Sequence, residues 1–142
     1  MTPPDDLPDA LLTAPSPLYL CVLTDQMDEK LTSQSRWRIL SLDLTACRSK
    51  ADFLERAAMT LKFPTWFGHN WDALSDCLTD MSWWPAGRYV IILRYAMDFC
   101  FADADGFNIA LEILRDAALQ QAEGPLPMRI LVDLQPSHYA TP

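Results

Sequence analysis

Three aspartates recur at four-residue intervals in the middle of the chain, at Asp72, Asp76 and Asp80. In a helix this spacing aligns the carboxylates along one face, where each neighbouring pair repels by roughly a few tenths of a kcal/mol. No Lys or Arg lies between Phe63 and Gly87 to offset that repulsion. Grouped carboxylates can bond to Arg and Lys side chains of another molecule. The stretch is therefore a candidate binding site for a cationic partner.

The helix predicted over residues 71–81 divides into two halves when its residues are placed at steps of about 100°. Small polar residues, Ser75 and Thr79, lie in the same half as the three aspartates. Small side chains let a partner approach closely, and nearby tryptophans such as Trp66 are frequent interface anchors. A docking face and a solvated acidic surface are both compatible with these residues. The other half is apolar and predicts a core contact through Trp71, Ala73, Leu74, Cys77, Leu78 and Met81.

Residues that could support catalysis are few. A metal site can be drawn from His69, Asp72 and Asp76, and Cys77 could act as a nucleophile with His69 as base, but no spacing fixes either geometry. A surface histidine and a core thiol are the preferred interpretations. The four cysteines form no metal-type spacing, which favours free buried thiols over two disulfides. We expect a protein that is not an enzyme, with no cofactor and no metal site.

The composition limits which kinds of partner and which cellular compartment are expected. A chain of 142 residues is long enough for one domain with a substantial core. Its net charge of −8 argues against direct binding to nucleic acid or to an anionic membrane, and favours a basic partner. No run approaches the roughly 20 apolar residues of a membrane helix, and no secretory signal is recognisable. We expect a cytoplasmic protein.

Hydrophobic patterning predicts an α/β domain over residues 18–134 with a small parallel sheet packed with helices. Strands are predicted at 38–44, 89–93 and 129–134, with a possible fourth, N-terminal strand at 18–23. Helices are predicted at 50–62, 71–81 and 106–122, and a short one within 96–105.

The polar stretch Thr24–Ser35 predicts a loop, which would allow the strands at 18–23 and 38–44 to pair as a long-looped hairpin. Residues 1–17 contain five of the eleven prolines and predict a flexible leader. Residues 135–142 predict a C-terminal tail.

The run from Phe63 to Asp80 resembles the barstar family, the intracellular inhibitors of small secreted ribonucleases. The shared pattern is a Pro, an aromatic pair, Gly-x-Asn, an apolar residue, Asp-Ala-Leu, and then x-Asp-x-Leu. In this chain it reads Pro64, Trp66-Phe67, Gly68-His69-Asn70, Trp71, Asp72-Ala73-Leu74 and Ser75-Asp76-Cys77-Leu78. The resemblance covers about residues 37–134 and implies the α/β fold of that family.

The resemblance also implies roles for individual residues. Asp76 would enter a nuclease active site and occupy the place of a substrate phosphate. The further contacts that it implies are acidic at Asp72 and Asp116, aromatic at Trp66, and polar at Asn70 and Thr79. The type member has Trp, Gly and Trp where this chain has Ser75, Asp80 and Met81. With Ser75 and Asp80, the expected contact face is more acidic and less aromatic than that of the type member.

The implied partner is a basic, extracellular-type ribonuclease or the nuclease domain of a larger toxin. The chain would block it stoichiometrically and would be a monomer when free. Two alternatives remain open from the residues alone. One is a non-inhibitory regulatory or adaptor module of the same fold that binds another basic partner. The other is a small cysteine hydrolase or metal enzyme.

Overall fold

A computed structural model of the chain describes residues 16–138, so most of the predicted leader and the end of the predicted tail lie outside the described residues. Four parallel strands form one sheet in the order β1-β4-β3-β2. This confirms the predicted α/β class with a small parallel sheet, including its N-terminal strand. The strands are β1 (Leu18–Cys21), β2 (Arg38–Asp43), β3 (Tyr89–Arg94) and β4 (Met128–Asp133).

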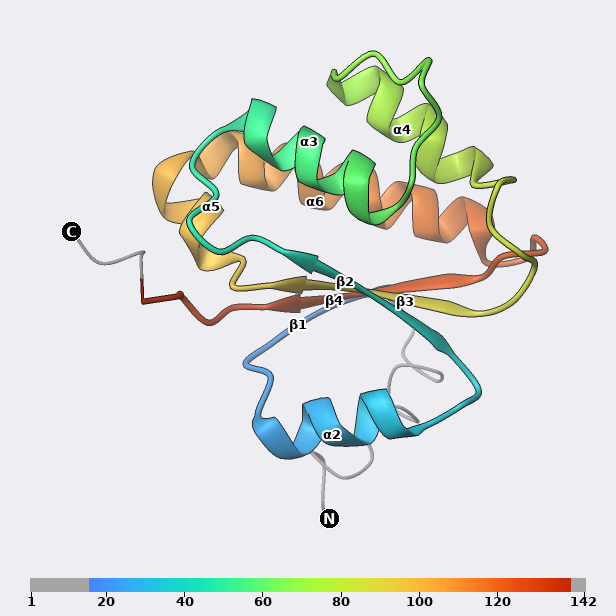
Figure 1. Cartoon of the computed structure of the whole chain (residues 1–142), viewed down its shortest axis with the longest axis horizontal. Coiled ribbons are helices and arrows are strands. Elements are labelled where there is room, and N and C mark those ends of the chain that lie inside the picture. The colour runs from blue at the N-terminus through green and yellow to red at the C-terminus, as the bar shows by residue number, and fades with distance from the viewer. Residues whose placement is uncertain (1–15, 139–142) are drawn as a thin grey trace.

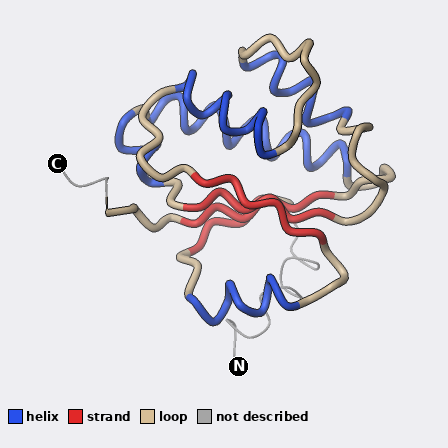
Figure 2. The backbone as a smooth tube through the Cα atoms, viewed as in Figure 1, coloured by secondary structure: helices blue, strands red, loops and turns tan. Residues whose placement is uncertain are grey.

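Helices cover both faces of the sheet (Figures 1 and 2). One face carries α3 (Lys50–Thr60), α4 (Trp71–Asp80), α5 (Met97–Ala102) and α6 (Ala104–Gln121), while α2 (Asp25–Ser33) lies alone on the other. The predicted helices at 50–62, 71–81 and 106–122 are therefore present with small shifts at their ends. In the described part of the chain, no helix has the length and apolarity that crossing a membrane requires.

The prediction of a loop over Thr24–Ser35 is wrong, because α2 occupies this stretch. The Thr24 side chain caps the helix by accepting a hydrogen bond from the Met27 amide at 3.1 Å. Met27 and Leu31, four residues apart, are buried against the sheet, while the remaining positions are mostly polar. Two apolar residues in nine positions gave too weak a periodic signal for the helix to be recognised.

The predicted hairpin between the first two strands is also wrong. β1 pairs with β4 and β2 pairs with β3, so β1 and β2 form opposite edges of the sheet. A helix between two strands of one sheet makes a crossover connection, which gives parallel strands instead of a hairpin. The partner of Leu18 is consequently Ile130, at the other end of the chain.

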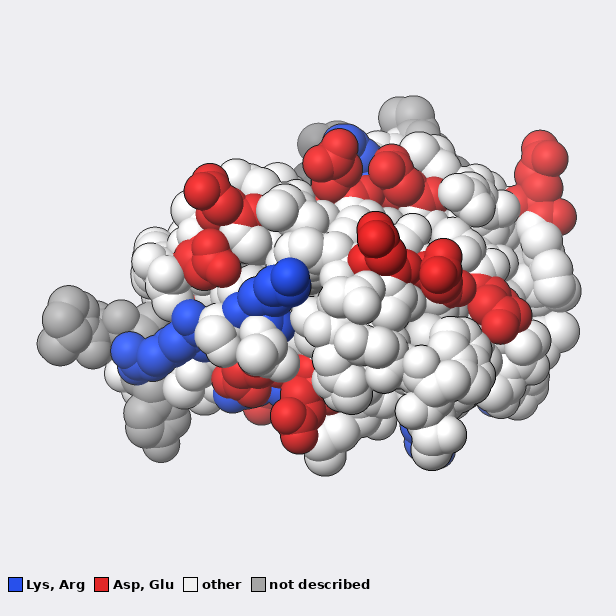
Figure 3. Space-filling view, turned by 90° about the horizontal axis from the view of Figure 1, so that it is seen from above, with Lys and Arg blue, Asp and Glu red and all other residues white. Residues whose placement is uncertain are grey.

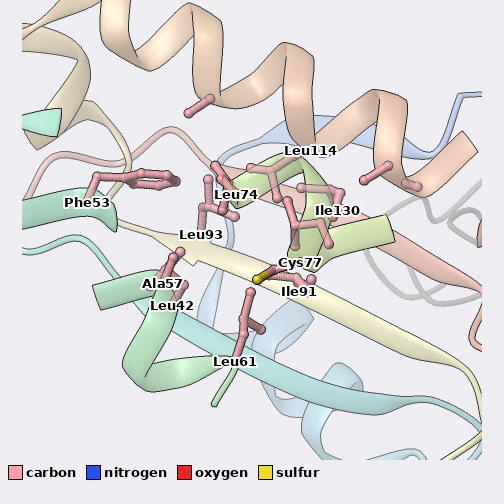
Figure 4. Packing of buried hydrophobic residues seen from close by; sticks show 14 of the residues in the cluster. Leu42, Phe53, Ala57, Leu61, Leu74, Cys77, Ile91, Leu93, Leu114 and Ile130 are labelled. Carbon is pink, nitrogen blue, oxygen red and sulfur yellow. The ribbon is translucent and has the colours of Figure 1, made fainter. Parts of the chain in front are cut away.

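The core fixes the position of α4. Buried side chains from the helices meet the upper face of β3 and β4, and Figure 4 shows Leu74 and Cys77 of α4 among them with Ile91 and Leu114. A second buried cluster on the lower face joins α2 to the sheet. Both central strands are thus covered on both faces, as their continuous apolar sequences require. α4 is therefore held on a rigid base.

Candidate functional site

Capping residues fix both ends of α4. The Asn70 side-chain oxygen accepts a hydrogen bond from the Ala73 amide at 2.7 Å and begins the helix. Met81 ends it in the left-handed conformation, with φ of 49°, and is buried. Between these caps the helix is divided as predicted: Leu74, Cys77 and Leu78 are buried, Ser75 and Thr79 are half-buried, and Asp72, Asp76 and Asp80 are exposed.

The loop before α4 separates its two adjacent aromatic residues. Phe67 is buried and packs against Phe63, with ring centroids 4.9 Å apart. Trp66 instead projects outward and is 59% exposed, although a large apolar side chain is normally buried. His69 takes a positive φ of 53° and its ring lies 4.7 Å from that of Phe67. The loop thus presents one indole to solvent immediately before the acidic helix.

Three side chains hold α4 and its flanking loops in place, and sequence reasoning did not find these roles. Trp83 and Trp84 both donate their indole N–H groups to the Leu61 carbonyl, at 2.9 and 2.7 Å. Gln121 of α6 donates to the carbonyls of Leu78 and Thr79, each at 3.0 Å. These bonds span 22 to 43 residues, so no local pattern in the sequence could reveal them.

The exposed half of α4 carries uncompensated negative charge. Among the residues that the structure describes, no Lys or Arg forms an ion pair with Asp72, Asp76 or Asp80. Figure 3 shows acidic side chains in a row over this part of the helical layer. The hydroxyl of Thr79 is bonded within the helix, to the Ser75 carbonyl at 2.9 Å. This surface of α4 is therefore anionic and lies on a helix that is capped at both ends.

Asp116 lies on a different helix from the other candidate residues. It is exposed on α6, which packs against α4 through the bonds of Gln121. The structure thus places Asp116 on the helix next to α4, while the other candidate residues lie on α4 and in the loop before it. The sequence-predicted residues that the structure leaves accessible are Trp66, Asn70, Asp72, Ser75, Asp76, Thr79, Asp80 and Asp116.

The rival catalytic sites find little support in the geometry. Burial, followed by the charges of Asp76 and Asp80, raises the pKa of the Cys77 thiol to about 11, which leaves almost no thiolate near neutral pH. All four cysteines are free, and Cys47 and Cys77 are buried. Across residues 16–138, no group of three His, Cys, Asp or Glu side chains is arranged to hold a metal ion.

The chain was also compared with known protein families. A family model described as Barstar (barnase inhibitor) matches residues 37–133, more than half of the chain. The match starts one residue before β2 and ends with β4, so it includes α3 to α6 and the acidic face. β1 and α2 lie outside it. A search of curated proteins finds no match.

Proposed function

The chain belongs to the barstar family, and from this premise we propose that it is a stoichiometric inhibitor of a basic ribonuclease or of a nuclease toxin domain. The observation that carries the proposal is the row of exposed aspartates on α4, held on a capped helix without cationic partners among the described residues. The proposed site of action is the cytoplasm, and the chain itself catalyses nothing.

The proposed mechanism is occupation of the site where RNA phosphate binds. A ribonuclease stabilises phosphate with Arg, Lys and His side chains, and Asp76 and Asp72 would bond to those groups in place of the substrate. Water would be excluded from these pairs once the complex forms, which slows dissociation. The net charge of −8 would speed the encounter with a basic enzyme. Trp66 and Asp116 would contact the rim of the active site.

The residues that differ from the type member indicate which kind of nuclease to expect as partner. Met81 is fully buried, so it offers no contact where the type member has a tryptophan. Ser75 is half-buried, and Asp80 adds a third carboxylate to the row. A face with fewer aromatic anchors and more charge suits a nuclease that is richer in Arg and Lys around its active site. We therefore expect binding to weaken steeply as salt is added.

The test is a titration of the full chain into a panel of small basic ribonucleases, with RNA cleavage as the readout. The variant D76N removes the central charge, and E29Q is the matched control because Glu29 is an exposed carboxylate on α2, across the sheet. We expect inhibition that is complete at one equivalent, lost by D76N and retained by E29Q.

Equal inhibition by D76N and E29Q would contradict the proposed role of α4. If no nuclease of the panel is inhibited, the full chain immobilised as bait in lysate and secretions of its source cell separates the remaining possibilities. A captured nuclease whose activity is blocked supports inhibition. A captured basic protein without nuclease activity supports the adaptor function instead.

A further inference from the structure

The two edges of the sheet differ in how they are protected from pairing with another strand. β2 carries charged, exposed residues at both ends, Arg38 and Asp43, which is a common protection of sheet edges. β1 lacks this protection, because no charged residue occurs from Ser16 to Thr24. Instead Leu20 and Val22 are 51% and 57% exposed. An apolar edge without charges favours the addition of a further strand.

The hydrogen-bonding groups of β1 alternate between its two sides. The carbonyls of Pro17 and Cys21 accept bonds from β4 amides, both at 2.8 Å. The N–H and C=O groups of the intervening even-numbered residues therefore point away from the sheet. The Leu18 N–H donates to the Ser16 hydroxyl at 3.3 Å, and this hydroxyl donates to the Leu18 carbonyl at 3.2 Å. Hydrogen bonds to a neighbouring strand could replace both. Within residues 16–138 no strand pairs with this side of β1, and Leu20 lies at its centre.

A groove runs beside the edge. It has a volume of about 450 Å³ and lies between Leu18 and Leu20 of β1 and one flank of α6. The residues of α6 that line it follow helical spacing and include an amide, an apolar, an acidic and a basic side chain, namely Asn108, Leu111, Glu112 and Arg115. Within the described part of the chain, neither Glu112 nor Arg115 forms an ion pair.

We propose that a second copy of the chain pairs with this edge, antiparallel and around a twofold axis. Leu20 lies opposite Leu20 of the second copy, and Leu18 lies opposite its Val22, giving a continuous eight-stranded sheet. The axis is perpendicular to the sheet, so the two α6 helices lie on the same face and run antiparallel. The proposal is thus an alternative to the monomer expected from the sequence.

Charge complementarity selects a second copy as the occupant. An antiparallel pair of α6 helices brings Glu112 of one copy to Arg115 of the other, and the reverse contact follows from the symmetry. Leu111 of each copy lies one residue outside these pairs along the helix. α4 contacts α6 through Gln121, and no residue of α4 lines the groove, so the aspartates of α4 stay accessible in the dimer. The inference is thus independent of the proposed inhibition.

The test measures the mass of the full chain by sedimentation equilibrium over a range of concentrations, near 150 mM salt to limit repulsion between two acidic chains. We expect a monomer–dimer equilibrium. L20K places a charge in the edge and should raise the dissociation constant by about tenfold or more. M59K is the matched control, because Met59 is 73% exposed on α3, away from the groove.

Charge exchange gives a second readout that does not depend on the strand. R115E and E112R should each weaken the dimer, because like charges then face each other. The double variant E112R/R115E should restore it, since the two pairs are re-formed with exchanged partners. A chain that stays monomeric up to about 1 mM overturns the proposal. A dimer that L20K leaves intact, or that the double variant fails to restore, also overturns it.

Discussion

Aspartates in two regions of this molecule have opposite surroundings. Asp98 in α5 and Asp133 at the end of β4 are each only 4% exposed, and protein donors surround both carboxylates. The backbone amides of Ala46 and Ser137 donate to Asp98 at 2.7 and 2.8 Å, and the Ser137 hydroxyl donates to it as well. The aspartates of α4 are exposed, and the described residues offer them no ion pair.

The two groups of aspartates therefore differ in surroundings: Asp98 and Asp133 are bonded within the fold, whereas the aspartates of α4 face solvent. Asp98 joins three distant segments, because its donors come from the residues after β2 and from those after β4. Removing it leaves buried donors unpaired, which is costly. Asp76 has no comparable bonds, and its repulsion with Asp72 and Asp80 slightly destabilises the helix. Binding of a cationic partner, as proposed above, would account for charges that lower the stability of their own helix.

Removing the central charge of α4 tests whether Asp76 serves binding and not stability. We expect D76N to weaken binding to the inhibited nuclease by about 2–5 kcal/mol, because an Arg or Lys of the enzyme then stays desolvated and unpaired. The free energy of unfolding should change by less than about 0.5 kcal/mol, because the side chain is exposed. Isothermal titration and urea unfolding of the same samples measure the two effects. A loss of stability that accounts for the loss of binding would contradict the comparison.

The buried carboxylate should give the reverse result. We expect D98N to lower the free energy of unfolding by about 1–3 kcal/mol, because its amide group would place a donor against the donors of Ala46 and Ser137. Nuclease binding by the folded fraction should be unchanged. Urea unfolding at neutral pH gives the measurement, with D105N on α6 as an exposed control. Equal effects of D98N and D105N would show that the network of Asp98 is not structural.

The contribution of Asp98 to the free energy of unfolding should also depend on pH. Burial alone would raise the pKa of Asp98, but the hydrogen bonds from Ser137 and Ala46, together with the charge of Arg48, hold the pKa below its ordinary value of 3.8. Because the folded state lowers this pKa, the carboxylate stabilises the protein above that value. The stabilisation is lost as the pH falls through the lowered pKa.

We therefore expect the free energy of unfolding to decline on acidification, and D98N to decline less steeply than the parent chain. Thermal unfolding between neutral pH and pH 3 compares the two. Parallel acid profiles would mean that Asp98 makes no contribution to the pH dependence.

The smallest expected effect has the opposite sign. Asp80 lies at the carboxyl end of α4, where the helix dipole disfavours a negative charge, and four residues from Asp76. D80N should raise the free energy of unfolding by roughly 0.2–0.5 kcal/mol and weaken nuclease binding slightly. Differential scanning calorimetry with replicate samples can resolve this gain. A stability loss would indicate that Asp80 makes a stabilising contact in the fold.

The sequence was informative where its signals are local. Helical periodicity predicted α3 and α4, and the side chains of Ser49 and Asn70 accept the backbone hydrogen bonds that cap these helices. It failed where a few distant contacts decide the structure. α2 depends on two buried apolar residues, and β1 finds its partner strand near the other end of the chain. No short-range pattern encodes such pairings.

The candidate site follows the same rule. The acidic half of α4 and the exposed Trp66 could be predicted from spacing and from the resemblance, because both belong to one continuous stretch. The residues that hold the site in place could not be predicted from the sequence. Gln121 contacts carbonyl groups more than 40 residues away, and nothing in the residues around it signals that role. The unprotected edge of β1 was likewise invisible until its place in the sheet was known.

Competition at the nuclease active site tests whether the carboxylates of α4 bind where RNA phosphate binds. The affinity of the full chain for a nuclease that it inhibits would be measured with and without a saturating nucleoside monophosphate bound to that enzyme. If the carboxylates of α4 occupy the phosphate site, the apparent affinity should fall in proportion to the nucleotide concentration, and D76N should show a much smaller dependence. Simultaneous binding of chain and nucleotide, with unchanged affinity, would contradict occupation of the phosphate site by α4.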